Sequence, residues 1–88
     1  MDVTVKEKTD KKIKLEIDAD LAFINLLNDR IWEQPGVKFS AYQRRHPYVG
    51  RPELVVRSSN PNKTIIKALD HIIADCQHLE KKVNRILK

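Results

Sequence analysis

The sequence contains few of the residues that build disulfides, metal centres and phosphate-binding loops. It has one cysteine, Cys76, and two glycines among 88 residues. A single cysteine excludes an internal disulfide and gives no thiol cluster for zinc, and two glycines leave no room for a glycine-rich phosphate loop. His71 and His78 are two helical turns apart, about 10 Å in rise, which is too far for them to share a metal ion. We therefore expect no catalytic site, no cofactor and no metal in this chain.

A long apolar run is also missing, and the chain is short. No stretch approaches the roughly 20 apolar residues that cross a membrane, and the first residues lack the basic-then-apolar order of a signal peptide, so we expect a cytoplasmic protein. A chain of 88 residues has room for one hydrophobic core, so residues 1–88 should form a single domain of modest stability. The composition, 41% hydrophobic and 33% charged, is typical of a folded chain. Stabilisation by a partner is plausible for a domain of this size.

Basic residues outnumber acidic ones by seventeen to twelve, which gives a formal net charge of +5. This excess permits contact with nucleic acid or with an acidic protein surface but requires neither. The basic residues are spread along the chain, and the densest cluster is the short run of Arg44, Arg45 and His46. The charge therefore favours an ordinary solvated surface and leaves a nucleic-acid contact open.

Alternation of apolar and polar residues predicts four strands. The first two, around residues 3–5 and 13–17, are each expected to be half buried and to be joined by a charged hairpin connection over residues 6–12. A third strand covers residues 37–42. A fourth covers residues 54–57, where a continuous apolar run is typical of a central strand.

A first helix is predicted over residues 21–34, with Asp18 or Asp20 capping its start and Pro35 ending it. Apolar side chains cover more of this helix than one sheet could bury, namely Phe23, Ile24, Leu26, Leu27, Ile31 and Trp32. This excess favours burial of part of the helix against a second protein. The alternative is that the whole helix packs within its own domain.

Asn60 and Pro61 are typical of a helix start, with asparagine as the cap and proline in the first turn. From there an apolar seam recurs in steps of four and three, at Ile65, Leu69, Ile72, Cys76, Leu79, Val83 and Ile86. We interpret Cys76 as a small buried hydrophobe of this seam. About 27 helical residues span roughly 40 Å, twice the length of a six-residue strand, so the helix should extend past its own sheet. Its end is either frayed or packed on another chain, and the regular seam favours the second.

Three segments in the middle of the chain carry a specific pattern: PGVKFSAY at residues 35–42, the pair His46 and Pro47, and GRPELVVR at residues 50–57. With the helix before them and the proline-initiated helix after them, they resemble archaeal RNA polymerase subunit L over nearly the whole chain. One departure stands at the start of the first helix, where the family usually has DHTLGN and this chain has DLAFIN at residues 20–25. The bulkier apolar residues should alter how that helix end meets its neighbour.

The resemblance implies an α+β fold, in which a four-stranded antiparallel sheet carries two helices and the long C-terminal helix packs across the sheet. Members of this family are similar to one half of the bacterial polymerase alpha-subunit dimer. They pair with another RNA polymerase subunit, the alpha-like partner designated D, and the heterodimer is the platform on which the two large catalytic subunits assemble. The nucleotide chemistry and its magnesium ions belong to those large subunits, so the resemblance implies a non-catalytic role in transcription.

We expect the partner interface to consist of apolar residues from both helices: Phe23, Ile24, Leu27, Ile31, Leu79, Val83 and Ile86. By resemblance alone, His46 and Pro47 are possible contacts to the large subunits. A rival hypothesis is a free-standing basic homodimer that binds RNA or DNA, supported by the net charge and by tyrosines 42 and 48 close to the arginines at 44 and 45. A small enzyme on the same fold is a third hypothesis, which the lack of a site disfavours.

Overall fold

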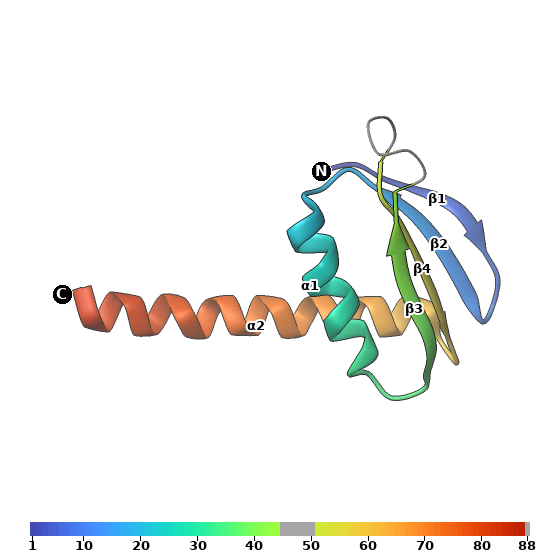
Figure 1. Ribbon diagram of the computed structural model, residues 1–88. Helices are drawn as coiled ribbons and strands as arrows, with labels where there is room; N and C mark the ends of the chain where they lie inside the picture. The colour runs from blue at the N-terminus through green and yellow to red at the C-terminus, as the bar shows by residue number, and fades with distance from the viewer. Residues whose placement is uncertain (45–50, 88) are drawn as a thin grey trace.

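The computed structural model describes residues 1–44 and 51–87 and confirms the predicted α+β fold. Its elements follow the order β1 (Val3–Lys8), β2 (Lys12–Ile17), α1 (Leu21–Trp32), β3 (Val37–Gln43), β4 (Glu53–Ser58) and α2 (Pro61–Leu87). The strands form one sheet in the order β1-β2-β4-β3, and every neighbouring pair is antiparallel. Both helices lie on the same side of this sheet (Figure 1).

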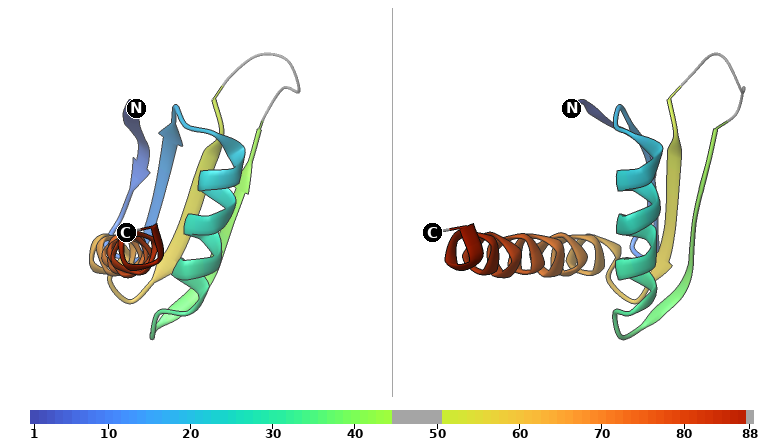
Figure 2. Two further views of the ribbon diagram at one scale, coloured as in Figure 1. Left: turned by 90° about the vertical axis from the view of Figure 1, so that its left-hand side faces the viewer. Right: turned by 60° about the vertical axis from the view of Figure 1, so that its left-hand side comes forward.

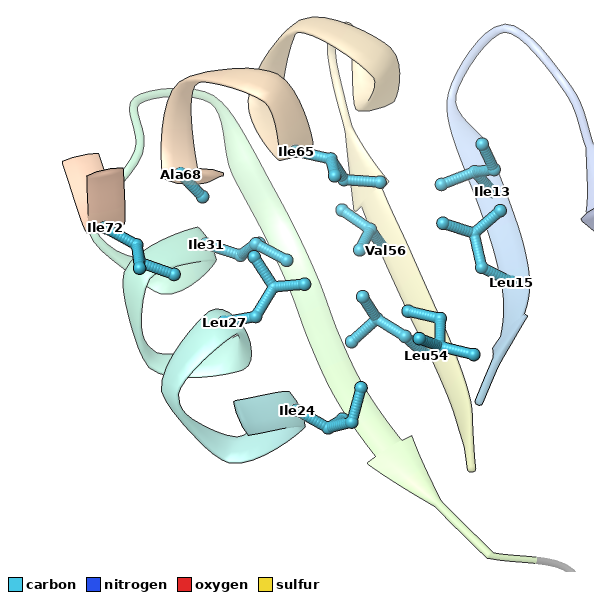
Figure 3. Packing of buried hydrophobic residues seen from close by; sticks show 11 residues of the cluster. Ile13, Leu15, Ile24, Leu27, Ile31, Leu54, Val56, Ile65, Ala68 and Ile72 are labelled. Atoms are coloured by element: carbon cyan, nitrogen blue, oxygen red, sulfur yellow. The ribbon is translucent and has the colours of Figure 1, made fainter. Parts of the chain in front are cut away.

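The hydrophobic core lies between the sheet, the whole of α1 and the first turns of α2. Because side chains alternate across a strand, Ile13, Leu15 and Ile17 of β2 and Leu54 and Val56 of β4 point to the helix-bearing face. The buried cluster consists of Ile13, Leu15, Ile17, Ile24, Leu27, Ile31, Leu54, Val56, Ile65, Ala68 and Ile72. Figure 3 shows these side chains converging from β2, β4, α1 and α2. One small core therefore unites elements from the whole length of the chain.

Local signals at both ends of α1 explain its position. The carboxylate of Asp20 accepts a hydrogen bond from the backbone N–H of Ala22 at 2.8 Å, which satisfies one of the free amides at the helix start. The helix ends at Trp32, two residues earlier than the sequence predicts. The turn that follows contains Gly36 with φ of +81°, a backbone conformation that side chains with a Cβ rarely adopt. This turn reverses the chain into β3.

The start of α2 is held to the end of β4 by short polar contacts. Asn60 accepts a hydrogen bond from the backbone N–H of Lys63 at 3.2 Å, and the hydroxyls of Ser58 and Thr64 lie 2.9 Å apart in the core. From there α2 runs away from the sheet, as the two views in Figure 2 show. The resulting molecule measures 47 × 34 × 17 Å. The prediction that the helix extends past its own sheet is confirmed.

The first strand differs from its predicted half-buried state. Val3 and Val5 are 55% and 56% exposed. They pair with Ile17 and Leu15 of β2, so they lie on the helix-bearing face of the sheet. α1 lies over β4 and β3 and not over this edge of the sheet (Figure 2). The period-two pattern therefore identifies the apolar face of β1 correctly, but that face lacks the expected cover within the chain.

Candidate partner-binding surface

The apolar seam of α2 passes from the core into solvent. Its first residues are covered by the sheet and α1, and Ile72 is the last buried residue of the helix. The described residues after it, as far as residue 87, are exposed. Leu79, Val83 and Ile86 are 63%, 41% and 77% exposed. About half of a continuous apolar stripe is thus without cover in this chain.

Cys76 belongs to this uncovered half. The thiol is free and exposed, so the interpretation of Cys76 as a buried hydrophobe is wrong for the chain by itself. The reason is geometric, because only the first turns of α2, as far as Ile72, lie against the core, and the rest of the helix runs away from the sheet (Figure 1). No group of His, Cys, Asp and Glu residues within residues 1–44 and 51–87 is arranged to hold a metal ion.

Two polar contacts link α2 to the end of α1 and the turn after it, just before the seam becomes exposed. Arg30 of α1 donates from Nη2 to Oδ2 of Asp75 on α2 at 2.7 Å. Gln34 Nε2 lies 3.1 Å from Nδ1 of His71 on α2. Beyond Asp75 the helix continues for twelve residues, about 18 Å. These contacts add to the apolar packing of α1 against the first turns of α2, from which the exposed seam extends.

The predicted interface residues of α1 require a correction. Ile24, Leu27 and Ile31 are 0%, 3% and 0% exposed, because they fill the space between α1 and the sheet. They have no surface to offer a partner, so their assignment to the interface is wrong. These residues pack within their own domain, which is the alternative that the sequence left open for the first helix.

Other residues of α1 supply the apolar surface that the sequence indicated. Phe23 is half-buried and Leu26 is 39% exposed. They precede Arg30 by seven and four residues, so they share the flank of α1 that faces α2. With the open strand β1 and the exposed part of the seam, they define a candidate partner-binding surface, which consists of Val3, Val5, Phe23, Leu26, Leu79, Val83 and Ile86.

Val3, Val5 and Leu26 are interface candidates that sequence reasoning missed. Their apolar character is visible in the sequence, but whether an apolar residue is covered depends on where the helices cross the sheet. That crossing is a tertiary property. The alternation in β1 is the available signal, because it predicts that one face of the strand is apolar. It does not indicate which element covers that face.

The residues behind the rival hypothesis lie in different places. Tyr42 is packed against the core and its hydroxyl donates to Asn25 Oδ1 on α1 at 3.2 Å, so the ring is part of the fold. Arg45, His46, Pro47 and Tyr48 lie outside the described residues. The predicted large-subunit contacts at His46 and Pro47 therefore stay predictions. Within the described part of the chain, no helix is both long and apolar enough to cross a membrane.

Comparison with known proteins gives a consistent result. Residues 5–82 match the family model described as the RNA polymerase Rpb3/Rpb11 dimerisation domain. DNA-directed RNA polymerase subunit Rpo11 of Methanothermobacter thermautotrophicus is 26% identical over 86 residues, which are 98% of this chain and 100% of that protein. Subunit Rpo11 of Sulfurisphaera tokodaii is 26% identical over 92 residues, covering 100% of this chain and 99% of that protein.

The fold also has a counterpart among solved structures. The crystal structure of DNA-directed RNA polymerase subunit L from Thermoplasma acidophilum superposes with a TM-score of 0.86. It is 22% identical in sequence, and the match covers 96% of this chain and 86% of that one. The sheet order and the long C-terminal helix are thus shared with a known polymerase subunit.

Proposed function

The chain belongs to the RNA polymerase Rpb3/Rpb11 dimerisation-domain family, and we propose that it is a non-catalytic polymerase subunit whose mechanism is heterodimerisation with the alpha-like partner. The resulting pair would be the platform on which the two large catalytic subunits assemble. His46 and Pro47 would contact those large subunits, a role that rests on the resemblance alone. As part of the polymerase the chain would work in the cytoplasm, the location that the sequence favours.

The observation that carries this proposal is the uncovered half of the apolar seam. Fully burying one Leu, Ile or Val side chain contributes about 1.5–3 kcal/mol. Leu79, Val83 and Ile86 are each at least 41% exposed, so a protein that covers them gains a large part of this free energy. Contiguous apolar surface of this kind on a small soluble domain is typical of an interaction site.

The form of the surface supports a specific partner rather than general adhesion. A rigid helix presents residues at a regular spacing, which suits packing of a second helix against it. The flank of α1 and the open face of β1 give the partner further apolar surface. A standard interface buries about 800 Å² on each side and has an apolar centre, and the exposed seam would supply that centre.

The proposal is tested by co-expressing this chain with the alpha-like partner and measuring co-purification. The double variant Leu79→Asp/Val83→Asp places two charges on the exposed seam, and we expect it to lose the alpha-like partner. The matched control Gln77→Asp/Asn84→Asp makes the same change of two charges at neighbouring exposed polar positions of α2 and should retain that protein. Because all four side chains are exposed, each variant should keep the far-ultraviolet circular dichroism of the parent chain. Normal co-purification of the seam variant would refute the proposal.

A further inference from the structure

On the outer face of the sheet, which carries no helix, two cationic residues and one aromatic residue lie side by side on three neighbouring strands. Lys12 of β2 lies directly opposite Arg57 of β4, and Arg57 lies opposite Phe39 of β3. The alternation places this row on the face opposite the buried Ile13 and Val56. Like charges directly opposite each other on paired strands are destabilising. Two adjacent cations in this position repel each other, and the carboxylate of Glu7, which pairs with Lys12 at 2.9 Å, offsets part of this repulsion.

A hollow opens beside this pair of cations. It has a volume of about 500 Å³ and is lined by Lys11, Lys12, Lys38, Arg57, Ser58 and Ser59. Lys38 lies at the bulge of β3, where the register shifts between Val37 and Phe39. Four residues with cationic side chains, from three strand ends and one turn, line this depression, and none of its lining residues carries a carboxylate. Its surface is almost entirely apolar, so the aliphatic stems of these side chains and not their charged groups form its wall.

Most of the positive charge around this hollow is uncompensated. Lys12 pairs with Glu7 at 2.9 Å, and the ammonium of Lys11 donates to the carbonyl of Ser59 at 3.0 Å. Lys38 and Arg57 form no ion pair with a carboxylate of the described ranges, residues 1–44 and 51–87. The pKa of the Glu7 carboxyl is lowered, first by its hydrogen bond and charge interaction with Lys12 and then by Lys14 and Arg57. The field at this surface favours anions.

An aromatic ring and a second, apolar hollow adjoin the cationic one. Phe39 is 43% exposed, and Trp32 packs edge-on against it with ring centroids 6.4 Å apart. On the outer face Phe39 also lines a hollow of about 190 Å³ together with Ala41, Tyr42, Gln43 and Val55. Cations, an exposed ring and an apolar recess therefore follow one another along β3 and β4.

We propose that this end of the outer face binds single-stranded nucleic acid, with Lys11, Lys38 and Arg57 contacting phosphates and Phe39 stacking on a base. A positively charged groove beside an exposed aromatic ring is the combination by which proteins hold single strands without strict sequence preference. An acidic peptide would use the cations but would leave the ring and its apolar recess without a role. A nucleotide has a charged phosphate and an aromatic base, so it can contact both the cations and the exposed ring with its recess.

This site is separate from the partner-binding surface. The partner-binding surface lies on the helix-bearing side of the sheet and on the projecting part of α2, whereas the proposed site lies on the opposite face (Figures 1 and 2). A partner on the helix side leaves the outer face open. The inference therefore does not depend on the proposed heterodimer, and variants of one surface should leave the other intact.

The test is fluorescence anisotropy of the full chain, and of its complex with the alpha-like partner, with a labelled oligouridine, an oligodeoxythymidine and an oligoglutamate of equal length. We expect both oligonucleotides to bind, with an affinity that falls steeply as salt rises. Oligoglutamate should bind at least tenfold more weakly. Equal or tighter binding of oligoglutamate would mean that the site binds acidic protein and not nucleic acid. Absence of any binding would refute both assignments.

Variants separate the roles of charge and stacking. Lys38→Glu/Arg57→Glu should lose oligonucleotide binding by more than tenfold, whereas the control Lys81→Glu/Lys82→Glu, with the same change in charge on α2, should lose far less. Phe39→Ala should weaken binding about tenfold, the size expected for one stacked base, without changing its salt dependence. If Lys38→Glu/Arg57→Glu fails to fold, the neutral Arg57→Gln takes its place. Equal affinity of the outer-face variants and the α2 control would overturn the proposal, whatever the result of co-purification with the alpha-like partner.

Discussion

Arg30 of α1 and Asp75 of α2 form an ion pair with N and O atoms 2.7 Å apart, at the point where α2 leaves the domain. The two residues are 45 positions apart in sequence. This contact joins the two helices next to the point where the apolar seam becomes exposed. The core packing between α1, α2 and the sheet, rather than this partly exposed pair, sets the direction of the seam.

The pair should contribute little to stability despite its short distance. The two side chains are 32% and 61% exposed, and ion pairs in such positions contribute about 0–1 kcal/mol. We expect a double-mutant cycle of Arg30→Met and Asp75→Ala, measured by urea denaturation, to give a coupling energy below about 1 kcal/mol. A coupling energy above about 2 kcal/mol would show that the pair stabilises the domain itself.

Core and seam positions should respond differently to truncation. Leu27 is 3% exposed, so Leu27→Ala should lower the free energy of unfolding of the chain by about 2–5 kcal/mol. Leu79 is 63% exposed, and Leu79→Ala should change it by less than about 0.5 kcal/mol. Urea denaturation of the isolated chain measures both. A small effect at Leu27 would contradict its place in the core.

The Glu7 carboxyl gives a pH-dependent signal at the basic end of the outer face. Its pKa lies below the ordinary value of 4.5, because Lys12 donates a hydrogen bond to the carboxylate and the charges of Lys12, Lys14 and Arg57 add to this effect. Since the folded pKa is the lower one, the stabilisation by this contact is complete above the unfolded pKa. It is lost as pH falls through the folded pKa.

Carboxyl-carbon NMR titration checks this expectation. Glu7 should titrate below 4.5 in the parent chain, and Lys12→Met should raise its pKa. The control Lys81→Met removes a charge from the exposed surface of α2 and should leave the titration of Glu7 unchanged. An unchanged pKa in Lys12→Met would exclude Lys12 as the main cause.

Gly36 should be difficult to replace for two distinct reasons. Its φ of +81° costs a residue with a Cβ about 1–2 kcal/mol, and an added Cβ would lie 2.7 Å from Ser59 Oγ. We expect Gly36→Ala to lower the free energy of unfolding by at least about 1 kcal/mol. In the Ser59→Ala background the contact is absent, so the cost should be smaller but not zero. Full recovery in that background would mean that the φ angle contributes nothing.

Local sequence signals predict most of the fold. Asp20, Pro35 and Asn60 act within a few residues of their own position, so the helix ends they mark are predicted closely. The resemblance to subunit L predicts the four-stranded sheet and the long helix. The match to the family model and the superposition on a solved structure confirm this prediction. The projection of α2 follows from length alone, because its 27 residues exceed the span of the strands.

Predictions that depend on packing are less accurate. Ile24 and Leu26 are both apolar residues of the same helix, yet only Ile24 is buried, because the sheet lies on its side of α1. The proximity of Lys12, Arg57 and Phe39 depends on the strand order β1-β2-β4-β3, which brings together residues far apart in sequence. No periodicity in the sequence specifies that order.

The central claim, assembly through heterodimerisation, is tested most directly by a pull-down from native extract with this chain tagged and the bound proteins washed at high salt. We expect the alpha-like partner to remain bound together with the large polymerase subunits, because the contact is mainly apolar and is not weakened by salt. Recovery of the chain without the alpha-like partner and without the large subunits would contradict the claim.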